Sequence, residues 1–159
     1  MLGLPRPEDD RVRLPFLAVL LAVVIALPGR PAGAQGWFEP PRGSAERRAL
    51  MDAVRPMAEQ LFGPPVEFMV HRLRVSGDLA FASVGAQRPG GGQIDVRRTP
   101  GWVQGYFMED AHHTGGQAIL VRRGGQWVVV DIVFGATDVW WVSPDYCVRY
   151  RAVIGDDCR

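Results

Sequence analysis

The sequence predicts an α+β domain in which one amphipathic N-terminal helix packs on a curved antiparallel sheet of four to five strands. Two observations support this prediction. Apolar residues recur with helical spacing over 44–61, whereas the chain from residue 66 onward carries strand-like runs separated by glycine- and proline-rich turns. Because one helix covers only one face of a sheet, we expect the sheet to wrap around it and leave an open mouth.

Residues 1–34 are set apart from the fold because they have the three parts of a secretory signal peptide. Basic residues precede an apolar run of 14 residues, Leu14–Leu27, and the tripeptide Ala32-Gly33-Ala34 follows it. A helix that spans a bilayer needs about 20 apolar residues. We therefore expect cleavage after Ala34, a periplasmic or secreted protein, and no stable membrane anchor after cleavage. An uncleaved anchor is the alternative.

The remaining chain divides into a flexible leader at 35–43, the α+β domain at 44–141 and an irregular C-terminal tail at 142–159. Ser44 is a good N-cap for the helix, and Gly63 followed by Pro64 ends it. Pro56 lies inside the helix, so we expect a kink there or two short helices. One apolar stripe is formed by Leu50, Ala53, Val54, Met57, Ala58 and Leu61.

Strands are predicted by alternating and β-branched residues. The first runs from Val66 to Val75, and the second returns over 79–86. Residues 88–100 form a glycine-rich loop that is either functional or mobile, a third strand is expected at 102–108, and a polar loop at 109–116. The clearest hairpin joins 117–123 to 126–134 through the two-residue turn Gly124-Gly125.

The chain has two cysteines, Cys147 and Cys158, and both lie in the tail. An even number of cysteines in an exported protein favours a disulfide over free thiols. We therefore expect their Cα atoms to lie within about 7 Å of each other.

This order of one helix and several strands resembles the nuclear transport factor 2-like, cone-shaped α+β superfamily, which includes cystatin-like relatives. The segment LVRRGGQWVVVDIVFGATDVW, residues 120–140, looks like a group of small exported bacterial proteins without assigned function. Enzymes of that superfamily, such as ketosteroid isomerase, use an Asp base with a Tyr and a protonated Asp in an apolar pocket. Tyr106, Asp131 and Asp138 have the matching residue types, although no motif aligns them with those roles.

Asp131 is the main catalytic candidate because it is the one charged residue in an apolar strand. The period of two predicts that it shares a face with Trp127 and Val129. A carboxylate on an apolar wall has a raised pKa and can act as a general acid or base. The alternatives are an ion pair with Arg122 or Arg123 across the hairpin, or a place on the solvent face.

The adjacent residues His112 and His113 are the metal-ligating candidates, beside Glu109 and Asp110. Neighbouring side chains on a strand point to opposite faces, so the two histidines can share a metal only within a loop. The alternative is a solvated turn, and we predict neither a bound metal nor a cofactor.

Aromatic and basic pairs are the candidates for binding. Trp140 and Trp141 are expected to line a ligand or partner site, the alternative being that they close the open end of the cone. Arg72 and Arg74 share a strand face, which is either an anion-binding patch or a solvated surface.

The net charge of the chain limits the classes of function that the sequence supports. The whole chain carries a formal net charge of +1, and the signal segment contains four basic and three acidic residues. The remainder is therefore neutral, and its charge gives no reason to expect binding to nucleic acid.

We expect an exported, non-enzymatic binding or interaction domain for an unknown small molecule or envelope protein. The alternatives are an isomerase- or dehydratase-like enzyme with Asp131 as general base, and an envelope accessory or inhibitor-like protein. The enzyme requires Asp131 to face an enclosed pocket.

Overall fold

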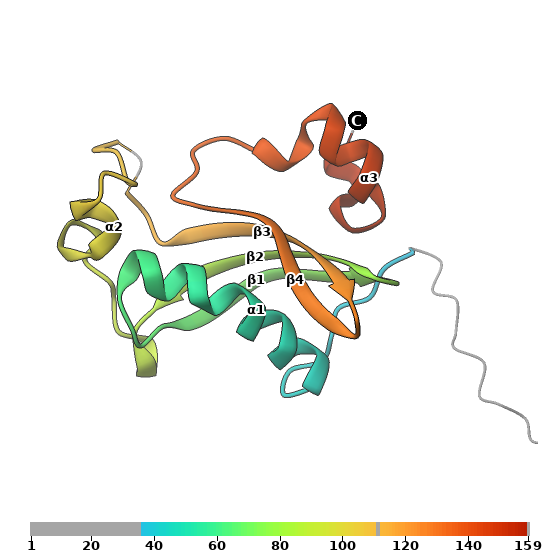
Figure 1. Cartoon of the computed structure of the whole chain (residues 1–159), viewed down its shortest axis with the longest axis horizontal. Helices are drawn as coiled ribbons and strands as arrows, with labels where there is room; N and C mark the ends of the chain where they lie inside the picture. Colours follow the sequence, from blue (N-terminus) through green and yellow to red (C-terminus); the bar gives the residue numbers. More distant parts are fainter. Residues whose placement is uncertain (1–35, 111, 159) are drawn as a thin grey trace, which may run out of the picture. The chain divides into compact units, whose positions relative to one another are not determined.

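The computed structural model describes residues 36–110 and 112–158, so the predicted signal peptide at 1–34 lies outside the described residues. The described chain has an α+β fold around one antiparallel sheet, with strand order β1-β2-β3-β4 (Figure 1). The four strands are β1 (Glu67–Ser76), β2 (Leu79–Gln87), β3 (Gly115–Arg123) and β4 (Gln126–Phe134). The predicted α+β class and an antiparallel sheet of four to five strands are therefore confirmed, but the described residues contain three α-helices and not the single helix expected.

The first helix, α1 (Ala45–Phe62), begins after Ser44, whose side chain accepts a hydrogen bond from the backbone N–H of Arg47. The helix continues through Pro56, so the expectation of two short helices was wrong. A proline removes one intrahelical hydrogen bond, and burial of the same apolar stripe on both sides of it holds the two halves together. The buried residues are Leu50, Met51, Val54, Ala58, Leu61 and Phe62. Met57, which was expected in this stripe, is 36% exposed.

Both predicted hairpins are present, but the strand predicted at 102–108 is absent from the structure. That segment instead contains α2 (Pro100–Val103) and a turn. The Thr99 hydroxyl accepts a hydrogen bond from the N–H of Trp102 at 3.4 Å, and Pro100 stands at the start of the helix. A threonine cap followed by proline favours a helix start over a strand, which explains the difference.

Two β-bulges change the alternation of side chains along the edge strands. The pairing of β1 with β2 skips His71, and the pairing of β3 with β4 skips Val130. An extra residue reverses which face the following side chains occupy. Asp131 pairs with Ile119 and therefore lies on the face opposite Trp127, so the predicted grouping of these two residues was wrong.

Each face of the sheet is covered by a helix (Figure 1). On one face α1 packs against a cluster that includes Ala80, Ala82 and Leu120. On the other face, Phe81 and Ile119 contact the C-terminal segment. That segment was expected to be an irregular tail, but it contains η3 (Trp140–Val142), α3 (Pro144–Ile154) and η4 (Gly155–Asp157). The sheet thus forms the middle of three layers.

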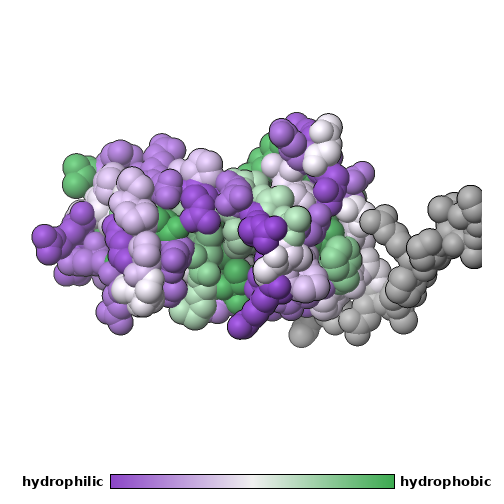
Figure 2. Space-filling view, turned by 90° about the horizontal axis from the view of Figure 1, so that it is seen from below, coloured by the Kyte–Doolittle hydropathy of each residue, from purple (hydrophilic) through white to green (hydrophobic). Residues whose placement is uncertain are grey.

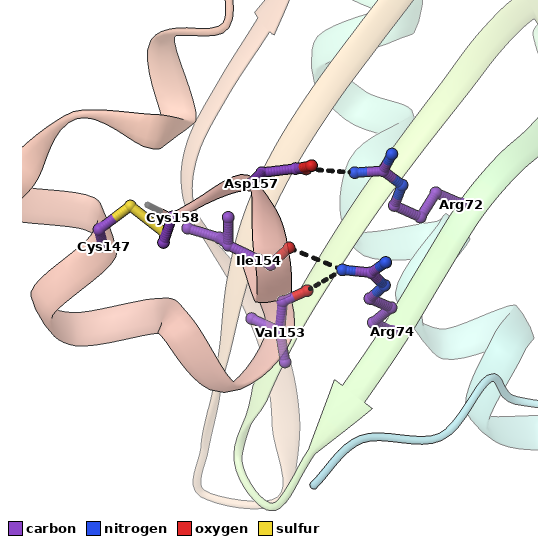
Figure 3. The surroundings of a disulfide bond; sticks show 7 residues. All are labelled: Arg72, Arg74, Cys147, Val153, Ile154, Asp157 and Cys158. Carbon is purple, nitrogen blue, oxygen red and sulfur yellow. Dashed lines mark hydrogen bonds and ion pairs between the residues drawn. A yellow bond between two sulfur atoms is a disulfide. The ribbon is translucent and has the colours of Figure 1, made fainter. Parts of the chain in front are cut away.

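The C-terminal segment is closed by an internal disulfide and is held to β1 by two polar contacts (Figure 3). A disulfide joins Cys147 to Cys158 with the Cα atoms 5.5 Å apart, as predicted. The Arg74 guanidinium donates to the carbonyl oxygen of Ile154 at 2.6 Å, and Arg72 forms an ion pair with Asp157 at 2.5 Å. These two arginines therefore hold the C-terminal segment, through α3 and η4, against β1. Both bind this segment, while the side chain of Arg72 stays 39% exposed, in line with the alternative of a solvated face.

The packing of α1 predicts that Leu61→Ala and Met57→Ala will have very different effects on stability. Leu61 is 3% exposed, and truncating a buried leucine costs about 2–5 kcal/mol of unfolding free energy. Met57 is 36% exposed and lies outside the buried stripe of the helix, so its truncation should cost about 0.5 kcal/mol or less. Denaturant titration of both variants measures the difference. Equal shifts of the two midpoints would contradict the observed orientation of the helix.

Candidate functional site

Asp131 is hydrogen-bonded to the start of α3. Its Oδ2 accepts a hydrogen bond from the Tyr146 hydroxyl, and its Oδ1 accepts one from the backbone N–H of Ile132 at 2.8 Å. The ring of Trp140 packs edge-on against Tyr146, with the centroids 5.2 Å apart. Asp131 thus connects β4 to the C-terminal layer.

The hydrogen bond to Asp131 raises the pKa of Tyr146 to about 12, with further contributions from burial and from the negative charge of Asp131. Tyr146 is therefore a neutral donor at physiological pH, and Asp131 is its acceptor. Arg122, expected as an alternative partner of Asp131, instead forms an ion pair with Glu46 on α1. Sequence reasoning missed Tyr146 because it placed this residue in an irregular tail.

The three residues that match the types used by ketosteroid isomerase are not brought together. Asp131 contacts Tyr146, whereas the Tyr106 hydroxyl accepts a hydrogen bond from the backbone N–H of Phe134 at 3.1 Å. Asp138 is exposed in the turn between β4 and η3. The geometry therefore provides no shared site for these side chains.

The two adjacent histidines have separate neighbours. In His113, Nδ1 accepts a hydrogen bond from the N–H of Gly115 at 3.1 Å, so its Nε2 donates to the carbonyl oxygen of Ala136 at 3.1 Å. The ring of His112 contacts Trp102, with the centroids 5.9 Å apart. Within the described ranges, no three His, Cys, Asp or Glu side chains are grouped so that they could hold a metal ion.

Trp140 and Trp141 are half-buried and pack in the cluster beneath α3. Trp141 lies against Phe81, with ring centroids 5.7 Å apart, and the two indole rings contact each other edge-on. The apolar surfaces of both tryptophans thus pack in the hydrophobic cluster between the sheet and the C-terminal segment. Neither tryptophan lines the groove described next.

An open groove of about 380 Å³ lies between α1 and β1. Its apolar residues are Met51 on the helix and Phe68 and Val70 on the strand. Polar side chains surround them, and the complete lining is Gly43, Arg47, Arg48, Met51, Asp52, Arg55, Glu67, Phe68 and Val70. Figure 2 views the molecule from the side of α1 and shows hydrophobic residues in the middle of this face, with hydrophilic residues on both sides.

The arginines of the groove differ in how their charges are balanced. Arg47 forms an ion pair with Glu39 at 3.1 Å. Arg55 lies 3.6 Å from Asp52 and stacks over Phe68, with 5.5 Å from the guanidinium carbon to the ring centroid. Arg48 donates to the backbone carbonyl oxygen of Gly43, and within the described residues no carboxylate lies within ion-pair distance of it. Arg48 is therefore the arginine of the groove that has no carboxylate partner in this part of the structure.

Sequence reasoning did not find the groove. Its residues come from two separate stretches, 43–55 and 67–70, and share no motif, so only the packing of α1 beside β1 brings them together. The one available signal was Phe68 and Val70, which alternate with charged or exposed residues along β1. That pattern indicates a half-buried strand and contains no information about its helical neighbour.

Comparison of the chain with family models, with characterised proteins and with solved structures finds no match. The resemblance to the nuclear transport factor 2-like superfamily therefore stays a prediction. Among the helices of the described residues, none is both long and apolar enough to cross a membrane.

The Tyr146–Asp131 bond predicts an alkaline titration that depends on Asp131. The folded-state pKa of about 12 lies above the ordinary value of 10.0, so the stabilising effect is complete below pH 10 and is lost as the pH rises through 12. We expect tyrosinate absorbance to show this late titration in the native protein, and Asp131→Asn to move it downward. Subtraction of the Tyr146→Phe curve isolates the signal, while circular dichroism reports whether the protein stays folded. An unchanged titration in Asp131→Asn would contradict the assignment.

Proposed function

We propose that the protein is an exported, non-enzymatic domain that binds a small molecule or a segment of an envelope protein in the groove between α1 and β1. The observation that carries this proposal is the combination of an apolar floor, formed by Met51, Phe68 and Val70, with Arg48, which among the described residues has no carboxylate partner. Binding sites commonly combine apolar walls with a few polar groups that orient the ligand. An amphipathic anion has the matching chemistry.

The position of Asp131 favours binding over isomerase- or dehydratase-like catalysis. Both of its carboxylate oxygens accept hydrogen bonds, from Tyr146 and from the backbone of Ile132. Asp131 is also absent from the lining of the groove. A general base must reach a bound substrate, and this carboxylate is directed at α3 instead.

Export is tested by fusing residues 1–40 to a reporter enzyme that is active only outside the cytoplasm. The apolar run Leu14–Leu27, followed by Ala32-Gly33-Ala34, predicts an active reporter whose intact mass corresponds to cleavage after Ala34. Leu21→Arg, which places a charge within the apolar run, should abolish activity. A membrane-bound product that retains residues 1–34 would contradict the proposal.

Ligand binding in the groove is tested with anilinonaphthalene sulfonate, a probe that joins aromatic rings to a single negative charge. We expect the folded mature protein to bind it with NMR shift changes around Met51 and Val70. Arg48→Glu should weaken binding about tenfold, because hydrogen bonds to charged groups contribute about 1.5–3 kcal/mol. Arg123→Glu, an exposed residue beside the β3–β4 turn, is the matched control. Equal affinities of the two variants, or shift changes elsewhere, would count against the groove.

A further inference from the structure

The outer edge of β1 pairs with an extended segment at one end only. Because β1 is the terminal strand of the sheet, its outer edge has no neighbouring strand in the described part of the chain. Phe38 pairs with Val75 through two backbone hydrogen bonds, each 2.9 Å long. Residues 36–43, expected to be a flexible leader, are thus attached to β1 at this point.

The paired segment then leaves the edge of β1. Pro40 and Pro41 have no N–H to donate to a strand, and the N–H of Ser44 bonds to the carbonyl oxygen of Pro41 as the chain turns into α1. The first part of β1, residues 67–72, is therefore left without a partner on its outer side among the described residues. An unpaired strand edge is a template for the addition of another strand.

This unpaired part of β1 contributes Glu67, Phe68 and Val70 to the groove. An extended segment placed here can bond to the strand backbone while its alternate side chains enter the apolar floor. The pairing of Phe38 with Val75 shows that the same edge already accepts an extended chain. A peptide added at 67–72 would continue that established pairing along the strand.

We propose that the groove binds an extended segment of a partner protein, which adds as a strand to β1 and places an acidic side chain beside Arg48. This inference rests on the proposed binding function and specifies its ligand. Arg47 and Arg55 have carboxylate partners, so Arg48 is the arginine able to take a new carboxylate. Arginine suits this role because its planar guanidinium matches the geometry of a carboxylate.

The groove also gives the segment a direction. Arg55 donates to the carbonyl oxygen of Val66, which fixes that part of α1 at the start of β1. Arg48 lies two turns earlier on the helix, about 10 Å away along its axis. Glu67 lies near the Arg55 end and repels acidic groups there. The acidic residue of the ligand therefore belongs at the end of the groove marked by Arg48.

The other exposed edge of the sheet lacks these features. Val128 and Val130 on β4 are each 40% exposed, but β4 contributes no residue to the groove. Each edge strand contains one bulge, at His71 in β1 and at Val130 in β4, so the bulges do not distinguish the two edges. The combination of a free edge, an apolar groove floor and an arginine without a carboxylate partner among the described residues therefore favours β1.

Two synthetic peptides of about ten residues test the proposal, long enough to span the free part of β1. Both alternate valine with serine, and they differ only in a glutamate or a lysine near one end. We expect the glutamate peptide to bind the mature protein and to protect the amides of residues 67–72 from hydrogen exchange. Arg48→Glu should weaken this binding about tenfold and improve binding of the lysine peptide, whereas Arg123→Glu should change neither.

The outcomes separate this inference from the proposed function. If anilinonaphthalene sulfonate binds in the groove but neither peptide does, the extended-segment inference is wrong and the groove remains a ligand site. If neither the probe nor the peptides bind, both proposals fail. Protection of β4 amides in place of β1 amides, or self-association of the protein that competes with the peptide, would overturn the inference in favour of another edge or a second copy of the chain.

Discussion

The structure depends on one constraint, which is that both faces of the central sheet are apolar. Phe81 and Ile119 are fully buried on one face, and Ala82 and Leu120 are fully buried on the other. A sheet that is apolar on both sides must be covered on both sides, because the hydrophobic effect contributes about 25 cal/mol for each Å² of apolar surface removed from water. A single helix cannot do this. The second face therefore requires α3. The arginine contacts connect the C-terminal segment to β1, and the disulfide links α3 to the residues that follow it.

Arginines on β1 and just after β2 bind the C-terminal ends of the two longer helices, α1 and α3. Arg88 donates to the carbonyl oxygen of Phe62 at the end of α1, as Arg74 does to Ile154 at the end of α3. The last carbonyl groups of a helix have no partner within it, so these contacts satisfy groups that would otherwise need water. Gly155 is essential to the second contact, because a Cβ atom there would lie 2.6 Å from the Arg74 guanidinium. Its positive φ of 74° also favours glycine.

Local patterns predicted α1, both hairpins and the disulfide, because helical spacing, tight turns and paired cysteines are recorded within short stretches of sequence. The orientation of Asp131 could not be predicted in this way, since a single extra residue at Val130 reverses the face. Helix α3 was missed because its apolar residues do not form one stripe. Val148 is 85% exposed, whereas Val153 is buried. The groove was missed for a different reason, because it exists only where α1 and β1 pack together.

The most direct test of this account is hydrogen exchange in Arg74→Met, compared with Arg123→Met at the exposed hairpin turn. Methionine keeps much of the side-chain volume at position 74 but removes the donors that bind the last carbonyl groups of α3. We predict that the amides of α3 will lose protection while those of α1 retain it, and that the control will match the native protein. Unchanged protection of α3, or an equal loss in both helices, would contradict the claim that Arg74 holds the layer covering the second apolar face.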